Sequence, residues 1–464
     1  MAMSGAGEPE ATADGHALAA RLLTWGLPLL LVVAYVALAV APDLRVASRL
    51  IPLTMSMVAL LALPLALPRR FAPRWSARTI FVLAALLRLL FVARQPELSD
   101  DLYRYLWDGD AMLRGQNPFA LAPAESQPAT PELAALRAKV NHPELVTIYP
   151  PAAQFLFAAA RGVHGGTTGA KLLFSLLDLG ACALILAMLR RTQTPTWRLA
   201  LYAWHPLPVL EIAGSGHIDG AASLALLAAL LVLARSKESP RDAVFAGALF
   251  AIAVMIKLLP LILLPCLLVL AGRRRVALFC SIAVLAMVGL CVPFIPDIAR
   301  GLGTLSTYAH RWEFGSWGFR TLRQLTASGD LARRVLAVLY AVIWLVASIW
   351  LFRRVRQEET PAIRLRLVLR TAYVVVVAFL LLTPTLNPWY ALPLVALLPL
   401  AFEPLGVTLS ATVFIGYTVL PRFARTGEWI ESDAAARAIF FVPMLALIAF
   451  LGVQRLRRDR SLRG

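Results

Sequence analysis

Residues 244–270 read VFAGALFAIAVMIKLLPLILLPCLLVL, an apolar run that a single charged residue, Lys257, interrupts. Charged segments flank the run on both sides, the mixed SKESPRD before it and the basic AGRRRV after it. Basic loops of membrane proteins face the cytoplasm, so we expect both flanks on that side. The chain must then cross the membrane, turn near Lys257, where Pro260 helps to break the helix, and cross back. The run predicts a polytopic membrane protein with Lys257 on the outer side.

The composition of the whole chain agrees with a membrane protein. Of the 464 residues, 59% are hydrophobic and only 16% are charged, whereas a soluble domain is about half apolar and about a quarter charged. The net charge of +18 comes from short clusters of Lys and Arg between apolar runs, and a nucleic-acid-binding surface would carry them in one patch. No nucleic-acid partner is therefore expected. The four cysteines lack ligand-like spacing, so neither a zinc site nor a disulfide framework is indicated.

Apolar runs near the crossing length of roughly 20 residues predict an all-α bundle of about 12 to 14 transmembrane helices in the lipid bilayer. The predicted spans are 26–43, 50–68, 78–94, 168–190, 197–213, 217–234, 243–256, 258–271, 274–295, 333–352, 367–383, 389–403, 405–420 and 437–453. Basic clusters then fall on alternate loops, as the positive-inside rule requires, with the short loop 403–405 as the exception. The scheme requires the segment 151–162 to lie in the interface or to re-enter rather than cross.

The chain is expected to form one membrane domain with two short ends. Residues 1–20 are predicted to be a disordered cytoplasmic tail, 21–453 a single integral-membrane domain and 454–464 a basic cytoplasmic tail. A cleaved signal is the alternative for the N-terminus. The run from Gly26 to Val40 is longer than most signal cores, which favours a retained first helix.

Nearly all unusual polar and aromatic motifs fall on the outer side of this scheme. The long first loop, 95–167, is predicted to be helical and opens with LSDDLYRYLWDGD, in which Asp100 and Asp101 follow Ser99, a residue suited to capping a helix. Asp100, Arg104 and Asp108 would then lie one turn apart on that helix. One interpretation is structural, with capping acids, a salt-bridge ladder, and Leu102, Leu106 and Leu113 facing the membrane.

The same loop has a functional interpretation. A carboxylate that Arg104 keeps ionised could accept a proton from a hydroxyl or bind a divalent cation. Tyr103, Tyr105 and Trp107 could stack on a sugar ring. Spacing alone does not choose between Asp100 and Asp101. Farther along the loop, NHPELVTIYPP offers His142, as a ligand or base or merely a solvated side chain, and Tyr149 at a turn.

Ionisable residues elsewhere on the outer side could complete a site. Glu211, His217 and Asp219 bracket the turn AGSGH between two spans, where charged residues usually serve a polar cavity. Asp219 could instead cap the next helix. Lys257 suits a phosphate leaving group, or it could simply extend its amine to the interface.

Two further outer segments mix polar and aromatic side chains. The stretch STYAHRWEFGSWGFRTLR carries Arg311 and Arg320 among aromatics, which fits a cleft for a lipid phosphate and a sugar or an interfacial belt. The turn TPTLNPWY places Asn387, Trp389 and Tyr390 outward, as a pocket wall or a simple helix break.

Several of these motifs together resemble a known family. SDDLYRYLWDG, NPF and NHPELVTIYPP in the first loop, with WHPLPVLEIAGSGHIDG and TPTLNPWYALP, are similar to bacterial GT-C glycosyltransferases, and more narrowly to polyprenol-phosphate-mannose-dependent mannosyltransferases. The resemblance spans most of 95–395. It implies a multi-pass enzyme of the bacterial inner (cytoplasmic) membrane that moves a hexose from a polyprenyl-phosphate donor to a lipid or glycan acceptor outside the membrane. A first-loop aspartate, here Asp100 or Asp101, would be the base or would hold Mg²⁺ or Mn²⁺.

The expected reaction is an inverting transfer in which Asp100 or Asp101 takes the acceptor proton. Lys257, with Arg311 or Arg320, would neutralise the departing phosphate. Mannose is implied by the resemblance alone. The rival function is a transporter or lipid flippase, which would need midplane ionisable residues and, often, repeats of broken helices. The sequence shows no such repeat, and its polar motifs gather on one face. A non-catalytic scaffold is the third alternative.

Overall fold

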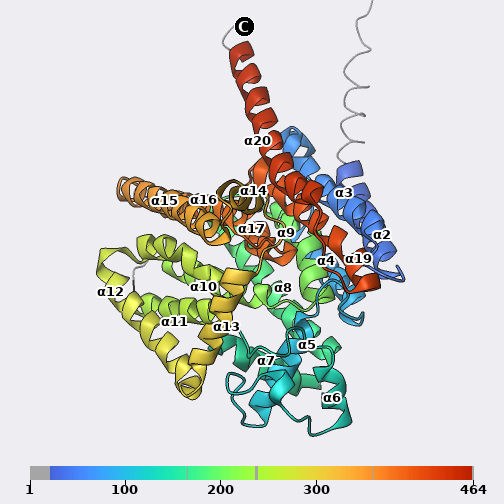
Figure 1. Cartoon of the computed structure of the whole chain (residues 1–464). Coiled ribbons are helices and arrows are strands. Elements are labelled where there is room, and N and C mark those ends of the chain that lie inside the picture. The colour runs from blue at the N-terminus through green and yellow to red at the C-terminus, as the bar shows by residue number, and fades with distance from the viewer. Residues whose placement is uncertain (1–20, 165, 236–238, 359, 462–464) are drawn as a thin grey trace, which may run out of the picture.

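The computed structural model describes residues 21–164, 166–235, 239–358 and 360–461, and this part of the chain is helical with no strand beyond isolated bridges (Figure 1). The all-α prediction is confirmed. The predicted tail 1–20 lies outside the described residues. The α-helices are α2 (Leu27–Ala39), α3 (Ala47–Ala66), α4 (Ala77–Val92), α5 (Asp101–Leu113), α6 (Pro131–Arg137), α7 (Pro151–His164), α8 (Thr167–Arg191), α9 (Ala200–Ala203), α10 (Asp219–Leu233), α11 (Pro240–Ile256), α12 (Leu264–Cys291), α13 (Ile298–Arg311), α14 (Trp317–Thr326), α15 (Gly329–Arg356), α16 (Pro361–Leu382), α17 (Leu392–Leu397), α18 (Pro404–Thr412), α19 (Leu420–Thr426) and α20 (Asp433–Ser461).

Short helices of other pitch complete the chain. They are η1 (Leu22–Gly26), η2 (Arg69–Phe71), η3 (Pro123–Glu125), η4 (Thr196–Leu199), η5 (Pro208–Gly214), η6 (Leu259–Leu263), η7 (Val292–Phe294), η8 (Pro388–Ala391) and η9 (Val413–Val419). Because α20 runs on to Ser461, the described part of the predicted basic tail is helical.

Eight helices of the described chain are long and apolar enough to cross a membrane, or nine if a bent pair counts as one span. The chain is therefore a multi-pass membrane protein. Fewer are found than the sequence predicted because several predicted spans are short or broken. The helices α4 and α11 have 16 and 17 residues, and the continuous stretch Leu259–Phe294 breaks at Gly272, whose φ of +69° leaves the helical region.

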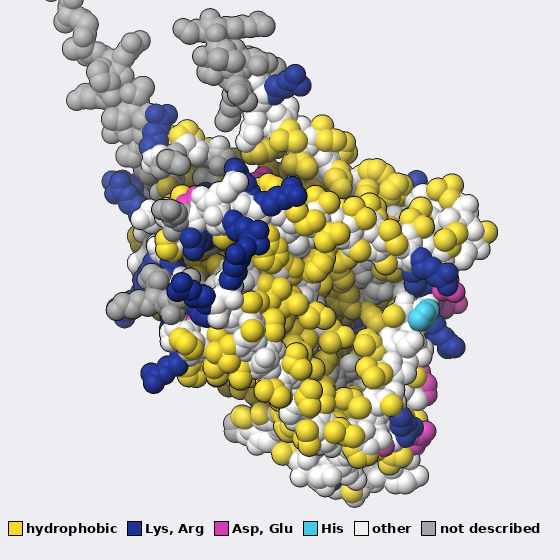
Figure 2. Space-filling model, turned by 90° about the vertical axis from the view of Figure 1, so that its left-hand side faces the viewer, with side chains coloured by type: hydrophobic (Ala, Val, Ile, Leu, Met, Phe, Trp, Pro, Cys, Tyr) yellow, Lys and Arg dark blue, Asp and Glu magenta, His cyan; other side chains and the backbone are white. Residues whose placement is uncertain are grey.

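The outer surface shows the charge asymmetry of a membrane protein. Figure 2 shows a broad apolar face, with most of the visible Lys and Arg along its left margin and most of the visible Asp, Glu and His, among fewer Lys and Arg, along its right margin. Exposed leucines and valines of α12 and α15 contribute to the apolar surface of the molecule. An apolar surface of this kind suits the hydrocarbon core of a membrane, because lipid tails cannot hydrogen-bond to polar side chains.

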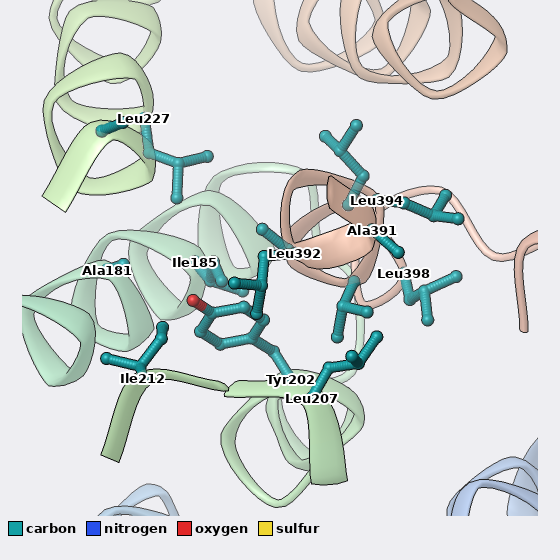
Figure 3. Close-up of a cluster of buried hydrophobic side chains, with 14 of the residues drawn as sticks. Ala181, Ile185, Tyr202, Leu207, Ile212, Leu227, Ala391, Leu392, Leu394 and Leu398 are labelled. Carbon is teal, nitrogen blue, oxygen red and sulfur yellow. The ribbon is translucent and has the colours of Figure 1, made fainter. Parts of the chain in front are cut away.

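The centre of the bundle is built around the short segments between α8 and α10. Tyr202 of α9 lies against Ile185 of α8, Ile212 of η5 and Leu392 of α17, and all four are at most 1% exposed (Figure 3). The residues from Leu199 to Ala222 are buried throughout. A predicted span of 197–213 is thus a set of broken helices, which is tolerated because protein rather than lipid surrounds it.

A buried ion pair ties three of these helices together. Arg88 of α4 donates to the Asp178 carboxylate of α8 through Nε at 2.8 Å and Nη2 at 2.5 Å, and its Nη1 reaches the carbonyl of Ala203 at 2.9 Å. The Tyr202 hydroxyl donates to the other oxygen of Asp178. Each charge therefore has several partners, as a charge away from water requires.

A second buried cation holds the break between η5 and α10. The two helices meet at 118° across Ser215–Ile218. Lys171, at the start of α8, is fully buried, and its Nζ donates to the carbonyls of Phe91 at 3.0 Å, Gly214 at 3.1 Å and Arg94. These carbonyls lie at the ends of α4 and η5, where a helix runs out of its own N–H donors. The lysine thus links α4, α8 and the break.

We predict that Asp178→Asn lowers the free energy of unfolding by about 3 to 5 kcal/mol, because the Arg88 charge would stay buried without a counter-ion. Denaturant titration of the purified protein in mixed micelles measures this. Asp43→Asn is the matched control: its pair with Arg45 is 37–40% exposed, and such pairs contribute at most about 1 kcal/mol. Equal losses in both variants would contradict the role given to the buried pair.

Candidate functional site

The long loop between α4 and α8 presents its two acids at the start of α5. The helix begins at Asp101, and Asp100 occupies the capping position without a side-chain cap bond. Ser99 was predicted as the cap; it lies one residue before the cap position, and its hydroxyl accepts a bond from the Asp101 N–H at 3.3 Å. Since neighbours on a helix diverge by about 100°, the two carboxylates can face different surroundings.

Two side chains hydrogen-bond to the two carboxylates, and a third lies nearby. Asn141 Nδ2 donates to Asp100 at 2.7 Å and to Asp101 at 2.9 Å. The Tyr149 hydroxyl donates to Asp101 Oδ2 at 3.1 Å, and His217 Nδ1 lies 3.8 Å from the same oxygen. Burial, and then the charge of Asp101, raise the pKa of Tyr149 well above its usual range, so its hydroxyl keeps its proton. Asp101 therefore faces the protein interior, while Asp100 is exposed.

The predicted ladder of Asp100, Arg104 and Asp108 is wrong at its first step. Arg104 Nε binds Asp108 at 2.9 Å and its Nη1 binds the Leu145 carbonyl at 3.0 Å, both inside the protein. Burial raises the pKa of Asp108 and the nearby Arg104 charge opposes the rise. This pair fastens the loop, and it does not hold the two helix-start acids.

The aromatic face of α5 is also structural. Tyr105 stacks on Phe157 of α7 with centroids 4.4 Å apart, and Trp107 packs with Leu133 and Val140. Both rings are 5% exposed or less, so neither offers a face to a sugar. Leu102 and Leu106, expected to face the membrane, are buried because α5 packs on α7 and α8 rather than on lipid.

Asp101 continues into a buried polar chain at the broken span. His217 Nε2 lies 3.6 Å from Glu211 Oε2, and the Tyr417 hydroxyl of η9 donates to Glu211. The His217 ring stacks on Trp389 with centroids 4.2 Å apart. His217 and Glu211 are fully buried. The break at 215–218 thus brings these side chains to the first loop, as the outer-side clustering predicted.

Lys257 and Asp219 form the second part of the site. The α11 helix ends at Ile256 and Lys257 is extended, so its ammonium can reach across to Asp219 Oδ2 at 2.6 Å. The ammonium also lies 5.6 Å from the Tyr390 ring centroid, and the Tyr390 and Tyr308 hydroxyls are hydrogen-bonded to each other. The predicted turn near Lys257 is confirmed.

A recess opens beside this ion pair. It is small, with a cavity volume of about 20 Å³, and is lined by Asp219, Ser223, Lys257 and the apolar side chains Ala222, Leu226, Leu259, Pro260, Leu263, Val376 and Pro393. Lys257 remains 20% exposed. The recess therefore combines one cation at its polar end with walls suited to hydrocarbon.

In the part of the chain that the structure describes, four further predicted site residues do not join this network. Arg320 binds Glu431 at 2.5 Å and Asp433 at 2.8 Å, which neutralises it. Arg311 is exposed at the end of α13, and Asn387 is half-buried before η8. His142 is exposed, with its ring 4.8 Å from that of Trp312.

Sequence reasoning missed Asn141, Tyr417 and Tyr308. Asn141 stands beside His142 in the motif NHPE, and an amide that bridges two carboxylates was a readable alternative there. Tyr417 and Tyr308 carried no such signal, because their partners lie far away in the sequence. Among the described residues, no group of three His, Cys, Asp or Glu side chains is arranged to hold a metal ion.

Comparison with known families decides the class of this protein. The family model described as glycosyltransferase family 87 matches residues 147–384, just over half of the chain. The chain belongs to glycosyltransferase family 87. This is a GT-C-type family, so the resemblance inferred from the motifs is confirmed at that level. No curated protein and no solved structure matches the chain.

The matched segment covers only part of the site of this family 87 glycosyltransferase. It includes Glu211, His217, Asp219 and Lys257. The two acids of the first loop precede it, and they join the matched residues through Tyr149 and His217. The contact between Asp101 and His217 therefore links the family segment to the first loop.

We predict that Gly216→Ala lowers the free energy of unfolding by about 1 to 3 kcal/mol, because the break leaves no room for a side chain. Gly216 has a φ of +86°, and a Cβ there would lie 2.8 Å from the buried Leu102 side chain. Denaturant titration measures the loss. Gly289→Ala is the control, since that helical position has no neighbour within 4 Å and alanine there should stabilise by up to about 1 kcal/mol.

Proposed function

We propose that this family 87 enzyme transfers a hexose from a polyprenyl-phosphate donor to a hydroxyl of a lipid or glycan acceptor at the extracytoplasmic face of the bacterial cytoplasmic membrane. Its family supports glycosyl transfer and its fold supports a membrane-borne substrate. The observation that carries the proposal is the meeting of Asp101, 19% exposed, with the buried His217 beside the recess at Lys257. Mannose is favoured by the motif resemblance.

Asp101 is the proposed general base. The acceptor oxygen attacks the anomeric carbon and forms the new glycosidic bond. The bond from that carbon to the donor phosphate oxygen breaks, and its electron pair leaves with the phosphate. Asp101 takes the acceptor proton. Because the acceptor attacks in a single displacement opposite the departing phosphate, the transfer inverts the anomeric configuration. Tyr149 and Asn141 orient the carboxylate, and orientation compensates for the modest basicity of a carboxylate.

The recess beside Lys257 is the proposed seat of the donor phosphate and the first part of its lipid. An ammonium has three donors, and Asp219 uses one of them. The remaining N–H groups can bind phosphate oxygens and stabilise the charge that develops as the phosphate leaves. The apolar walls suit an isoprenoid chain. Lys257 takes this role without Arg320, whose charge is already paired.

The two acids also fit a divalent cation. Carboxylate and amide oxygens suit Mg²⁺ or Mn²⁺, and Asp100 with Asp101 would hold it. The Asn141 amide group now lies between the two carboxylates. Rotation of the amide would exchange its oxygen and nitrogen, so that the Asn141 oxygen would face the space between the two carboxylates. The cation, when bound, would supply charge stabilisation to the phosphate.

We predict that Asp101→Asn lowers the rate of sugar transfer by at least about 10²-fold, because general-base help of 10²- to 10⁴-fold is lost. Purified enzyme with polyprenyl-phosphate mannose and a membrane lipid extract, followed by mass spectrometry of the products, measures the rate. Asp100→Asn is the matched variant and should lose less. Wild-type transfer by Asp101→Asn at equal abundance would refute the base assignment.

We predict that Lys257→Met lowers kcat for transfer by about 10²-fold or more, because removing one charge-stabilising donor has that effect in other enzymes. Steady-state kinetics with varied donor measures kcat and KM separately. Arg425→Gln is the control, because this cation of α19 is exposed and bonds only to its own helix turn among described contacts. A change of KM alone would assign Lys257 to ground-state binding instead.

A further inference from the structure

A second recess lies at the opposite ends of the two helices that flank the site. It is lined by Leu184, Ala187 and Arg191 of α8, by Ala228, Leu231 and Val232 of α10, and by Arg235 just after α10. The recess has a volume of about 380 Å³ and opens outward. Its apolar lining residues are half-buried rather than packed in the core. It is therefore a groove on the surface of the bundle, separate from the recess at Lys257.

The chain direction places this groove near the other membrane surface. The α8 helix begins with Lys171 close to the break and ends at Arg191, and α10 begins at Asp219 and ends at Leu233. At 1.5 Å per residue, the 25 residues of α8 extend about 37 Å, which is enough to cross the hydrocarbon core. A ligand in the groove would be remote from Asp101.

Each wall of the groove repeats one pattern. Along α8, Leu184 and Ala187 precede Arg191 at spacings of three and four residues, and along α10, Ala228 and Val232 precede Arg235 by the same helical steps. Residues at these spacings share one helix face. The groove is thus apolar along its length and cationic at one end, and its two alanines leave it room.

Among the described residues, the charges at that end are only partly cancelled. Arg191 Nη2 donates to the carbonyl of Ala234, a neutral acceptor. Arg235 Nη1 binds Asp242 at 3.1 Å, but the Arg235 side chain remains 60% exposed. Two guanidinium groups therefore face one carboxylate, and each keeps further N–H donors. A phosphate is the complementary partner, because guanidinium groups bind its oxygens in pairs.

We propose that this groove binds an anionic phospholipid of the membrane, with its phosphate between Arg191 and Arg235 and an acyl chain along the apolar walls. Basic pockets between membrane helices bind anionic headgroups in this way. The inference rests on the groove alone, so it does not depend on the proposed transfer reaction. The other occupants, a free phosphate ion or no specific ligand, are outcomes of the test.

The test measures lipids retained by the purified full-length protein. After delipidation in detergent, phosphatidylglycerol and phosphatidylcholine are titrated in separate experiments and bound lipids are counted by native mass spectrometry. We expect one site that prefers phosphatidylglycerol. The double variant Arg191→Gln/Arg235→Gln should bind it about thirtyfold more weakly, since each cation near the membrane surface strengthens binding about fivefold.

Two further variants make the result specific. Arg273→Gln/Arg274→Gln removes the same charge from the exposed bend of α12 and should leave the site intact. Ala228→Leu fills the groove without changing its charge and should also weaken binding, which gives a second test if the arginine variant fails to fold. Thermal unfolding verifies folding of each variant.

Three results would overturn the proposal. Equal binding of the two lipids would show that the headgroup charge is not recognised. Unchanged phosphatidylglycerol binding in either groove variant, or an equal loss in the α12 variant, would show that the lipid binds elsewhere or only through total charge. Displacement of the lipid by millimolar inorganic phosphate, with phosphate itself retained, would identify a free-anion site instead.

Discussion

The whole site depends on one constraint: a helix that breaks inside a membrane protein must find a partner for every polar group that the break releases. At the break, Lys171 provides a partner for the Gly214 carbonyl, and it also binds the carbonyls of Phe91 and Arg94 at the end of α4. Gly216 supplies the backbone conformation that the turn needs. Burying a lysine without a carboxylate partner costs free energy unless backbone carbonyls surround its ammonium group. With the break fixed in this way, Glu211, His217 and Asp219 are held where the first loop can reach them.

The same constraint explains why the charged side chains of the site come in linked sets. Asp219 is paired with Lys257, and Glu211 is bonded to Tyr417, since a lone charge at these depths would be strongly unfavourable. Such pairs fix the dipoles and charges before a substrate arrives, and this preorganisation is the main source of electrostatic stabilisation in enzymes. The site is therefore paired at Asp219 and Glu211 and exposed at Asp100.

The sequence predicted the class of fold and much of the site because hydropathy and charge act locally. The run around Lys257 predicted a turn at that residue, and the AGSGH segment predicted a turn bracketed by Glu211, His217 and Asp219. The sequence prediction failed where tertiary packing determines which way a side chain faces. Tyr105, Trp107 and Arg104 could all bind a substrate by their chemistry, but they face the protein interior. Gly109 lets α5 pack directly against α7 at Phe157. Nor could spacing show that Arg320 would be neutralised by acids more than 100 residues later.

The helix α8 shows how one element serves both membrane surfaces. It carries Lys171 at the break, Asp178 in the central ion pair and Arg191 in the distal groove. Because Asp178 is bonded to Arg88 and Tyr202 at mid-length, α8 cannot slide along its neighbours without separating a buried charge from its partner. Its two ends are therefore held at a fixed separation, and a lipid bound at Arg191 would set the depth of the bundle in the bilayer. That depth would in turn determine how far the Lys257 recess lies from the membrane surface at its own end of the bundle, where we propose that the donor phosphate enters.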